Sequence, residues 1–451
     1  MSLGYYLDPL GCAKNQVDAE TMMGFLQEAG WVAVADPAEA DLIIINSCGF
    51  IEKAKQESIN TLLEYRQTYP DKKIVLAGCL AQGYAQELSA ALPEADLIFG
   101  NRDLAKITQA AALALSSPEV SCRVLVPAAI PAPDTSPLGR RPLLSLPGSA
   151  YIKIAEGCDN HCTFCGIPRI RGPLQSRSLS QVVDECRELL DRGIKELCLI
   201  GQDLGSYGTD RTGGVSELPQ LLKALSQVEG RFWVRMLYLH PDKFPLPILE
   251  LIRQDPRLLP YFDLPFQHGA SKILRAMNRQ GTGESYLALI QHIRAMLPDA
   301  TIRSTFLTGF PGETEKDFQG LLHFQGQAQL DWVGCFTYSR EEHTPAYSMK
   351  PRIPRNIAAA RQRLIETRQI PITEKRLDRL VGTTLEALVE EPVPGEEEPK
   401  RQVYQARLRR QAPEVDGLTF IQSDTLLVPG TFVWGRICTR HGFDLELRLE
   451  D

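Results

Sequence analysis

Three cysteines stand close together in the segment EGCDNHCTFCGIP, residues 156–168, with the spacing C-x3-C-x2-C. They are Cys158, Cys162 and Cys165. A structural zinc site usually closes with four ligands from paired C-x2-C units, and no partner pair accompanies this run, although His161 lies inside it. An iron–sulfur cluster held by three thiolates leaves one iron without a protein ligand, and a cofactor could bind that iron and receive an electron. The spacing therefore favours an iron–sulfur cluster with one open coordination position.

A second set of cysteines lies upstream, each just after an apolar run. Cys12 follows LGYYLD, Cys48 follows DLIIIN and Cys79 follows KKIVLAG. If these runs are strands of one parallel sheet, their carboxyl ends share an edge at which ligands bind. The three cysteines would then converge in space. A second cluster with an open iron, able to hold a sulfur atom for transfer, is the chemistry that this set predicts.

The remaining five cysteines show no such pattern, and we interpret them as structural. Buried thiols of this kind behave as small hydrophobic side chains. They are Cys122, Cys186, Cys198, Cys335 and Cys438.

Residues 1–115 alternate short apolar runs with helical patterns. This alternation predicts an open parallel α/β sheet, with strands at residues 3–8, 41–46, 72–78 and 95–100. Residues 116–147 are rich in proline and serine and are predicted to be a linker.

A second alternating region covers residues 148–375. Its six apolar runs lie at residues 150–156, 195–201, 232–239, 261–266, 302–310 and 331–338. Six β/α units predict an incomplete, TIM-type (β/α)6 barrel with its chemistry at the carboxyl ends of the strands. Residues 380–451 carry short strand-like runs separated by glycine and proline, which predict a small antiparallel β-barrel.

Composition narrows the class of protein. The 451 residues are 43% hydrophobic and 23% charged, with a net charge of −7, so there is no overall basic character of the kind that nucleic-acid binding needs. No apolar run approaches the roughly 20 residues of a membrane helix, and the start shows no signal-peptide pattern. A cytoplasmic protein in a reducing compartment is expected, so metal binding or catalysis explains the cysteines better than disulfides.

The C-x3-C-x2-C run resembles the signature of the radical S-adenosylmethionine enzymes. Nearly the whole chain resembles the methylthiotransferases, and its motifs are most similar to the RimO branch of that family. The motifs are LGCAKNQVDAE, NSCGFIEKAKQESI, GCLAQGY, EGCDNHCTFCGIPRIRG, YFDLPFQHGASKILRAMNR, GFPGETEKDF and FTYSREEHTPAY. His343 stands where RimO relatives commonly carry glycine, and IGQDLGSYG shares features with both RimO and the tRNA-modifying MiaB branch.

The resemblance implies two [4Fe-4S] clusters, S-adenosylmethionine, and a sulfide or polysulfide bound to the upstream cluster. It implies that Cys12, Cys48 and Cys79 hold one cluster and that Cys158, Cys162 and Cys165 hold the other. It also implies contacts to S-adenosylmethionine from Phe164, Asp203, Gln267 and Arg303. Other catalytic residues are not implied, and the C-terminal barrel corresponds to a TRAM domain.

The implied reaction uses two molecules of S-adenosylmethionine, one as methyl donor and one as radical source, to place a methylthio group on Cβ of an aspartate in ribosomal protein uS12. An electron donor such as flavodoxin or ferredoxin is implied as a second partner. Two alternatives remain: a tRNA methylthiotransferase of the MiaB branch, and a non-enzymatic iron–sulfur protein that binds ribosomes.

Charge helps to choose between a protein and a tRNA substrate. From residue 381 to the end there are one lysine and seven arginines against thirteen acidic residues, a net charge of −5. A domain that grips tRNA should be basic, because phosphate neutralisation supplies most of the non-specific affinity. An acidic barrel suits a basic ribosomal protein better.

Overall fold

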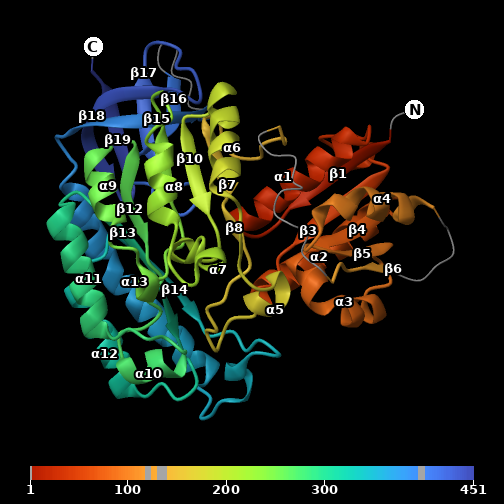
Figure 1. Ribbon diagram of the computed structural model, residues 1–451, viewed down its shortest axis with the longest axis horizontal. Helices are drawn as coiled ribbons and strands as arrows, with labels where there is room; N and C mark the ends of the chain where they lie inside the picture. The colour runs from red at the N-terminus through yellow and green to blue at the C-terminus, as the bar shows by residue number, and fades with distance from the viewer. Residues whose placement is uncertain (1–2, 117–122, 129–139, 395–401, 451) are drawn as a thin grey trace. The chain divides into compact units, whose positions relative to one another are not determined.

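The computed structural model describes residues 3–116, 123–128, 140–394 and 402–450 (Figure 1). The chain forms two compact units. One comprises Met1–Leu144, Lys153–Gln181 and Ser339–Tyr347, and the other comprises Ser145–Ile152, Val182–Tyr338 and Ser348–Asp451. The segment that holds Cys158, Cys162 and Cys165 therefore belongs to the same unit as the upstream cysteines.

A six-stranded parallel sheet forms the centre of the first unit. The four predicted strands are all present, and two short strands, β2 and β6, lie at the edges. The bounds are β1 (Gly4–Pro9), β2 (Val32–Ala33), β3 (Leu42–Ser47), β4 (Lys73–Gly78), β5 (Leu97–Gly100) and β6 (Arg123–Leu125), in the order β2-β1-β3-β4-β5-β6. Strand β6 comes from the segment predicted as a linker and pairs in parallel with β5. Cys122 lies outside the described residues.

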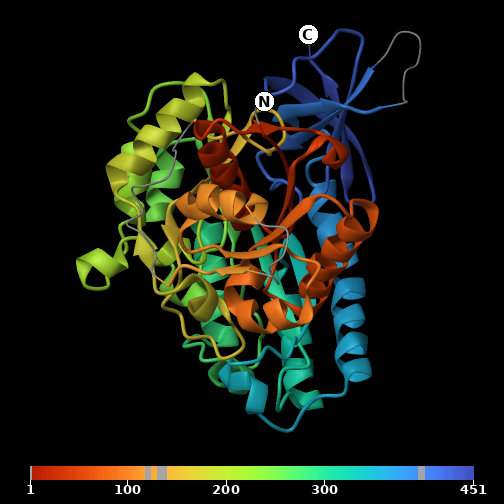
Figure 2. The same cartoon turned by 90° about the vertical axis from the view of Figure 1, so that its right-hand side faces the viewer.

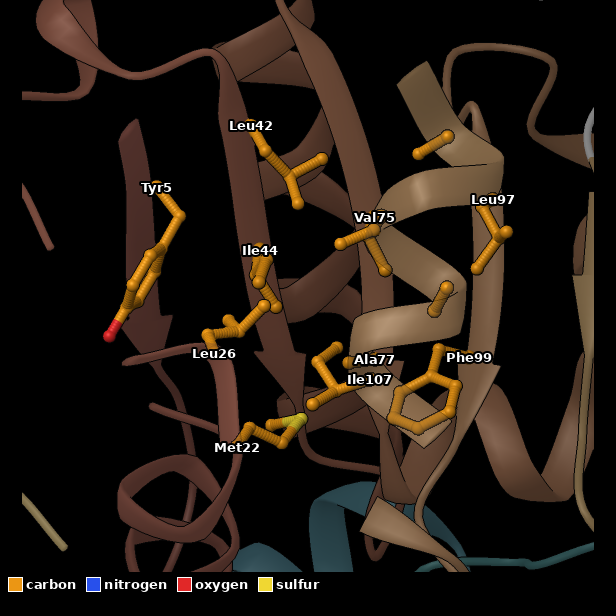
Figure 3. Packing of buried hydrophobic residues seen from close by; sticks show 13 residues of the cluster. Tyr5, Met22, Leu26, Leu42, Ile44, Val75, Ala77, Leu97, Phe99 and Ile107 are labelled. Carbon is orange, nitrogen blue, oxygen red and sulfur yellow. The ribbon is translucent and has the colours of Figure 1, made fainter. Parts of the chain in front are cut away.

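Helices cover both faces of this sheet, and successive residues of each strand face opposite ways. Leu42 and Ile44 pack under α1 (Ala13–Glu28) and α4 (Ile107–Leu115), in the cluster that Figure 3 shows. Ile43 and Ile45 pack with side chains of α2 (Glu52–Thr68) and α3 (Cys79–Ala91). A parallel sheet is buried on both faces, which explains the uninterrupted apolar runs in the sequence.

Several short elements of the first unit lie next to its cysteines in the sequence. Strands β8 (Ala155–Glu156) and β9 (Gln175–Ser176) pair in an antiparallel way, and the short helix α5 (Ile167–Arg171) follows Cys165. The 3-10 turns η1 (Pro37–Glu39) and η2 (Leu104–Lys106) complete the connections.

The second unit contains the six predicted strands in one open sheet, of order β14-β13-β12-β11-β10-β7. They are β7 (Ser149–Lys153), β10 (Glu196–Ile200), β11 (Trp233–Met236), β12 (Leu258–Asp263), β13 (Thr301–Thr308) and β14 (Trp332–Thr337). Between and after them lie α6 (Leu179–Asp191), α7 (Thr209–Thr212), α8 (Leu218–Leu225), α9 (Ile248–Gln254), α10 (Ser271–Ala276), α11 (Gly283–Met296), α12 (Glu315–Ala328) and α13 (Arg355–Asp378). This arrangement is the predicted incomplete barrel.

The C-terminal barrel, blue in Figures 1 and 2, closes through five strands in the order β15-β16-β17-β19-β18. They are β15 (Thr384–Pro392), β16 (Gln402–Leu408), β17 (Thr419–Ser423), β18 (Phe432–His441) and β19 (Asp444–Leu449). One feature differs from the prediction. Strand β17 pairs with β19 in parallel, so the barrel is not wholly antiparallel.

Over the described residues, no helix is long and apolar enough to span a membrane.

Candidate functional site

The three upstream cysteines lie in neighbouring loops at one edge of the first sheet. Cys12 lies between β1 and α1, Cys48 directly follows β3, and Cys79 opens α3 directly after β4. Strands β1, β3 and β4 are adjacent, so the loops are adjacent too. A Cβ built on Gly11 would lie 3.0 Å from Cβ of Cys48, and one built on Gly49 would lie 2.7 Å from the backbone nitrogen of Leu80, the residue after Cys79. The structure thus brings these loops into contact, as predicted for the edge of a parallel sheet.

Asn15, in the first turn of α1, ties the three loops together. Its Nδ2 atom donates to the backbone oxygens of Leu10 at 2.8 Å and Ser47 at 3.0 Å. Its Oδ1 atom accepts from Sγ of Cys79 at 3.3 Å. Its backbone oxygen accepts from Nδ2 of Asn46 at 2.7 Å. Asn15 is buried, so these bonds replace water contacts that its amide would otherwise lose.

The sulfur of Cys79 is surrounded by hydrogen-bond donors. Nδ2 of Asn101 lies 3.3 Å from it, and Nη2 of Arg171 lies 3.1 Å from it. Burial raises the pKa of Cys79 to about 12, against the attraction of the Arg171 charge. A metal ligand must be deprotonated, so a metal that binds Cys79 displaces a proton from it.

The other two thiols of the upstream set differ from Cys79. Cys12 is exposed, and although desolvation by the surrounding loops opposes its ionisation, Lys14, Arg171 and backbone N–H groups lower its pKa below the ordinary value. Burial raises the pKa of Cys48, with a backbone N–H of Phe50 working in the opposite direction.

The C-x3-C-x2-C segment folds as a tight loop held by its own backbone. The N–H of Cys162 donates to Asn160 at 2.8 Å, and the N–H of Cys165 donates to Cys162 at 3.1 Å. The N–H of Asn160 points at Sγ of Cys158 at 3.4 Å, and the N–H of Cys158 donates to the oxygen of Gly172 at 3.2 Å. Cys158 and Cys162 are buried, and Cys165 is half-buried.

A cavity of about 180 Å³ lies beside this loop. Cys162 and Cys165 line one part of it, and Gly49 and Phe50, which directly follow Cys48, line another. Tyr84, in the first half of α3, also reaches the cavity. Side chains associated with both cysteine sets therefore border one space within the first unit.

A second wall of this cavity comes from residues 339–347. Glu341 forms an ion pair with Lys55 of α2, and the Nζ atom of Lys55 also donates to Oη of Tyr84 at 2.7 Å. His343 lines the cavity with its backbone at a φ of +62°, a left-handed conformation that costs a residue with a side chain about 1–2 kcal/mol. Glycine adopts this conformation without that cost, which explains why it suits position 343. The side chain of His343 occupies space at the cavity that a glycine would leave open.

Sequence reasoning missed a buried charge network between the two cysteine sets. Arg171 pairs with Asp18 at 2.8 Å and with Glu156 at 2.9 Å, and Lys153 pairs with the same two carboxylates. Burial opposes ionisation of Glu156, but the charges of Arg171 and Lys153 lower its pKa to about 2. The signal for this network in the sequence is Arg171, six residues after Cys165.

The residues that the family resemblance implied near S-adenosylmethionine lie in different places. Phe164 is half-buried in the cysteine loop of the first unit. Asp203 follows β10 in the second unit and caps the turn η4 (Leu204–Ser206), accepting from the N–H of Gly205 at 2.9 Å and from the N–H of His240 at 3.0 Å. These bonds account for the burial of Asp203 without a ligand.

Gln267 follows β12 and Arg303 lies inside β13. Gln267 has a φ of +68° and pairs through its backbone with Thr305 at 2.8 Å. Arg303 is the third residue of its strand and donates to Asp416 at 3.1 Å. Arg303 thus lies near the amino end of its strand, whereas Asp203 and Gln267 follow the carboxyl ends of theirs. Contacts of all four residues with S-adenosylmethionine stay predictions.

The donor set fits an iron–sulfur cluster. Within the described residues, no three histidine, cysteine, aspartate or glutamate side chains form a set that could hold a single metal ion. Thiolates that each bind a different iron of a cluster need not approach as closely as thiolates that share one ion. N–H donors at the sulfurs of Cys79 and Cys158 are also what cluster-binding sites provide.

Comparison with known proteins identifies the domains of the chain. Residues 4–100 match the Uncharacterized protein family UPF0004, residues 152–324 match the radical SAM superfamily, and residues 381–449 match the TRAM domain. The chain is a radical S-adenosylmethionine enzyme with a TRAM barrel at its C-terminal end.

Relatives of nearly full length refine this class. The chain is 44% identical to the ribosomal protein uS12 methylthiotransferase RimO of Treponema denticola, over 98% of this chain and 99% of that one. It is 41% identical to the protein of the same name from Moorella thermoacetica, over 92% of each chain. It belongs to the RimO family of methylthiotransferases, as its motifs predicted.

Solved structures support the fold. The radical S-adenosylmethionine methyltransferase TsrM from Kitasatospora setae, solved with cobalamin and a [4Fe-4S] cluster, aligns with a TM-score of 0.55 at 16% identity over 77% of each chain. A second structure of TsrM, with tryptophan and a SAM analog, gives a TM-score of 0.53 at 13% identity. At this identity the likeness concerns the fold alone.

Proposed function

We propose that this chain adds a methylthio group to Cβ of an aspartate in ribosomal protein uS12. The observation that carries the proposal is the similarity to RimO proteins over nearly the whole length, from the first cysteine loop to the last strand of the TRAM barrel. The net charge of −5 on residues 381–451 supports a basic protein as substrate rather than tRNA.

Two sets of three thiols would hold two [4Fe-4S] clusters, each with one iron free of protein ligands. Cys158, Cys162 and Cys165 form the radical-generating set, and Cys12, Cys48 and Cys79 form the auxiliary set. When bound, the clusters and S-adenosylmethionine supply the radical, the methyl group and the sulfur. The protein supplies binding, orientation and exclusion of water.

The cavity beside the loop of Cys162 and Cys165 is the proposed place for the target side chain, and the residues around it would position that side chain. A target side chain that enters it would lie between the loop of Cys162 and Cys165 and the residues that follow Cys48. Glu341 and Lys55 fix one wall through their ion pair, and Tyr84 is fixed by its bond from Lys55. Side chains that are already fixed by hydrogen bonds and ion pairs can orient a substrate without changing their own positions during the reaction.

The setting of the reaction follows from the proposed substrate. The enzyme would encounter this ribosomal protein in the cytoplasm, either as the free protein or as part of the small ribosomal subunit. If Cys158, Cys162 and Cys165 hold a cluster that cleaves S-adenosylmethionine, one electron would be consumed for each cleavage, and a flavodoxin or ferredoxin would be the partner that supplies it.

The test is an anaerobic reconstitution of the full chain with iron, sulfide, S-adenosylmethionine and a reductant. A uS12 peptide that contains the target aspartate and bulk tRNA are offered side by side, and both are read by mass spectrometry. We expect the mass increase of a methylthio group on the aspartate of the peptide and no change in tRNA. The same increase on tRNA alone would overturn the substrate, and deoxyadenosine formed without either product would show that neither is the substrate.

A further inference from the structure

Arg171 lies on the segment of the radical-generating cysteines yet contacts a ligand of the other set. It is the last residue of α5, the short helix that follows Cys165. Its Nη2 atom lies 3.1 Å from Sγ of Cys79, an N–H···S hydrogen bond within the first unit. The arginine is only 2% exposed, so water does not compete for this bond.

Two carboxylates and an amide hold the guanidinium in place. Nη2 donates to Asp18 at 2.8 Å and approaches Oδ1 of Asn15 at 3.1 Å, while Nη1 donates to Glu156 at 2.9 Å. The planar fork of arginine can meet acceptors on both nitrogens at once, which the single ammonium group of lysine cannot do. The direction of the N–H toward Cys79 is therefore fixed by the protein before any metal binds.

The arrangement stays satisfied when Cys79 loses its proton. As a thiol, Cys79 donates to Oδ1 of Asn15 at 3.3 Å. As a metal ligand it can only accept, and the two N–H groups of Nη2 are then shared among Cys79, Asp18 and Oδ1 of Asn15, one of them in a three-centre bond. Asp18 and Glu156 balance the charges of Arg171 and Lys153, so the network is neutral before the cluster is present.

We propose that Arg171 is a positioning residue of the auxiliary cluster, which orients Cys79 and raises the reduction potential of the cluster through the N–H···S bond. Hydrogen bonds to cluster sulfurs favour the more negative, reduced state, and they are a known determinant of cluster potential. The inference rests on the two-cluster assignment proposed above and is independent of the substrate. It also ties the environment of one cluster to the segment that carries the ligands of the other.

The experiment measures the potential of the auxiliary cluster alone. The full chain carries alanine at Cys158, Cys162 and Cys165, so that one cluster remains, and its midpoint potential is determined by an EPR-monitored redox titration. In this background we expect Arg171→Gln to lower the midpoint, because the N–H···S bond is lost and the network keeps an uncompensated negative charge. We expect at least a tenfold change in the ratio of reduced to oxidised cluster at a fixed potential, about 59 mV for a one-electron couple.

Two further variants separate the causes. Arg171→Lys keeps the charge and loses the fork, so we expect a smaller shift in the same direction. Arg66→Gln is the matched control, since Arg66 also makes several hydrogen bonds within the first unit, to Glu94 and Asp96, at no cysteine. It should leave the midpoint unchanged.

The outcomes are decisive. A loaded cluster with the parent midpoint in both Arg171 variants would overturn the proposal. If Arg171→Gln keeps its circular dichroism spectrum but binds no iron, while Arg66→Gln binds it normally, the orienting role is supported, and Arg171→Lys then decides the effect on potential. A uS12 assay that failed with the parent protein would count against the proposed substrate and would leave this result standing.

Discussion

Asn15 is a single residue on which the loops of all three upstream cysteines depend. Replacing it with leucine removes the donor that the backbone oxygens of Leu10, which is partly buried, and Ser47, which is buried, share, and each buried polar group left unsatisfied costs about 1–3 kcal/mol. We expect Asn15→Leu to lower the free energy of unfolding by a few kcal/mol and to reduce iron binding by about half, since one of two clusters is affected. Thermal unfolding and iron analysis measure these effects.

Asn60 provides the control for this substitution. It is an exposed asparagine on α2 whose side chain accepts from Gln56, one turn earlier on the same helix, at 2.8 Å. Asn60→Ala should change neither quantity. Full iron loading in Asn15→Leu would show that the cysteine loops hold together without the amide.

A substitution of Cys158 distinguishes the roles of the two proposed clusters. As a member of the C-x3-C-x2-C set, it is needed only for the radical step under the proposed function. We expect Cys158→Ala to abolish formation of deoxyadenosine and to leave methylation of sulfur at the auxiliary cluster. Cys438→Ala, at an exposed cysteine of β18, should behave as the parent. Deoxyadenosine formed by Cys158→Ala at the parent rate would rule the ligand assignment out.

At the scale of elements, the turn before Cys158 depends on a glycine. Gly157 has a φ of +72°, and a Cβ there would lie 2.0 Å from the backbone oxygen of Pro173. The chain pairs β8 with β9 around this turn, so neither side can move without disturbing the cysteine loop. The close approach, in addition to the left-handed conformation, requires glycine at this position.

Gly157→Ala should therefore reduce iron binding at the radical-generating site. An alanine in the left-handed conformation costs about 1–2 kcal/mol, and because of the close contact we expect the loss of folding stability to exceed this value. Gly30→Ala isolates that strain, because Gly30 has a φ of +86° and nothing within 4 Å of its Cβ position. Iron content and the midpoint of thermal unfolding are compared for both variants. Equal behaviour of the two would show that the contact with Pro173 relaxes easily.

At the largest scale, a buried charge network joins the central barrel to the TRAM barrel within the second unit. Glu196 of β10 is fully buried and pairs with Arg235 of β11 at 2.7 Å and with Arg407 of β16. Arg407 also pairs with Glu390 of β15. Burial opposes ionisation of Glu196, but Arg407 and Arg235 lower its pKa to about 2.

This network predicts the response of stability to acid. The folded-state pKa of Glu196 lies below its ordinary value of 4.5, so the stabilisation is fully present above about pH 4.5 and is lost as the pH falls toward about 2. Its size is roughly 3 kcal/mol from the shift. Glu196→Gln should lower the free energy of unfolding by about 3–5 kcal/mol at neutral pH, because two buried arginines lose a partner. It should also flatten the dependence of stability between these pH values.

Denaturant unfolding at pH 7 and at several values below 4.5 measures both effects. Arg187→Gln is the control, since the Arg187–Asp184 pair on α6 is largely exposed and such pairs contribute little. An acid dependence in Glu196→Gln equal to that of the parent would place the titrating group elsewhere.

The main strands of the first sheet, their parallel direction and the edge at which the upstream cysteines gather could be predicted from the sequence, whereas the order of the strands in the sheet came from the structure. Apolar runs of six to nine residues, separated by helical patterns, predict a parallel sheet, and a parallel sheet places successive strand ends at one edge. Strand β17 could not be predicted in this way, because TFIQS gains its strand conformation from pairing with β16 and β19 and not from its own pattern. Its parallel pairing with β19 arises from closure of the barrel.

The sequence by itself determined which residues are candidates for the chemistry of this protein: six cysteines in two sets of three, their spacing and the strand ends on which the upstream set lies. That information is local, since ligand type, spacing and apolar period are all read along the chain. Only the tertiary structure decided that Asn15 and Arg171 surround Cys79 and that Lys55 and Glu341 meet at the cavity. Those contacts join residues between 64 and 286 positions apart, and such pairs form only when folding has closed the intervening chain.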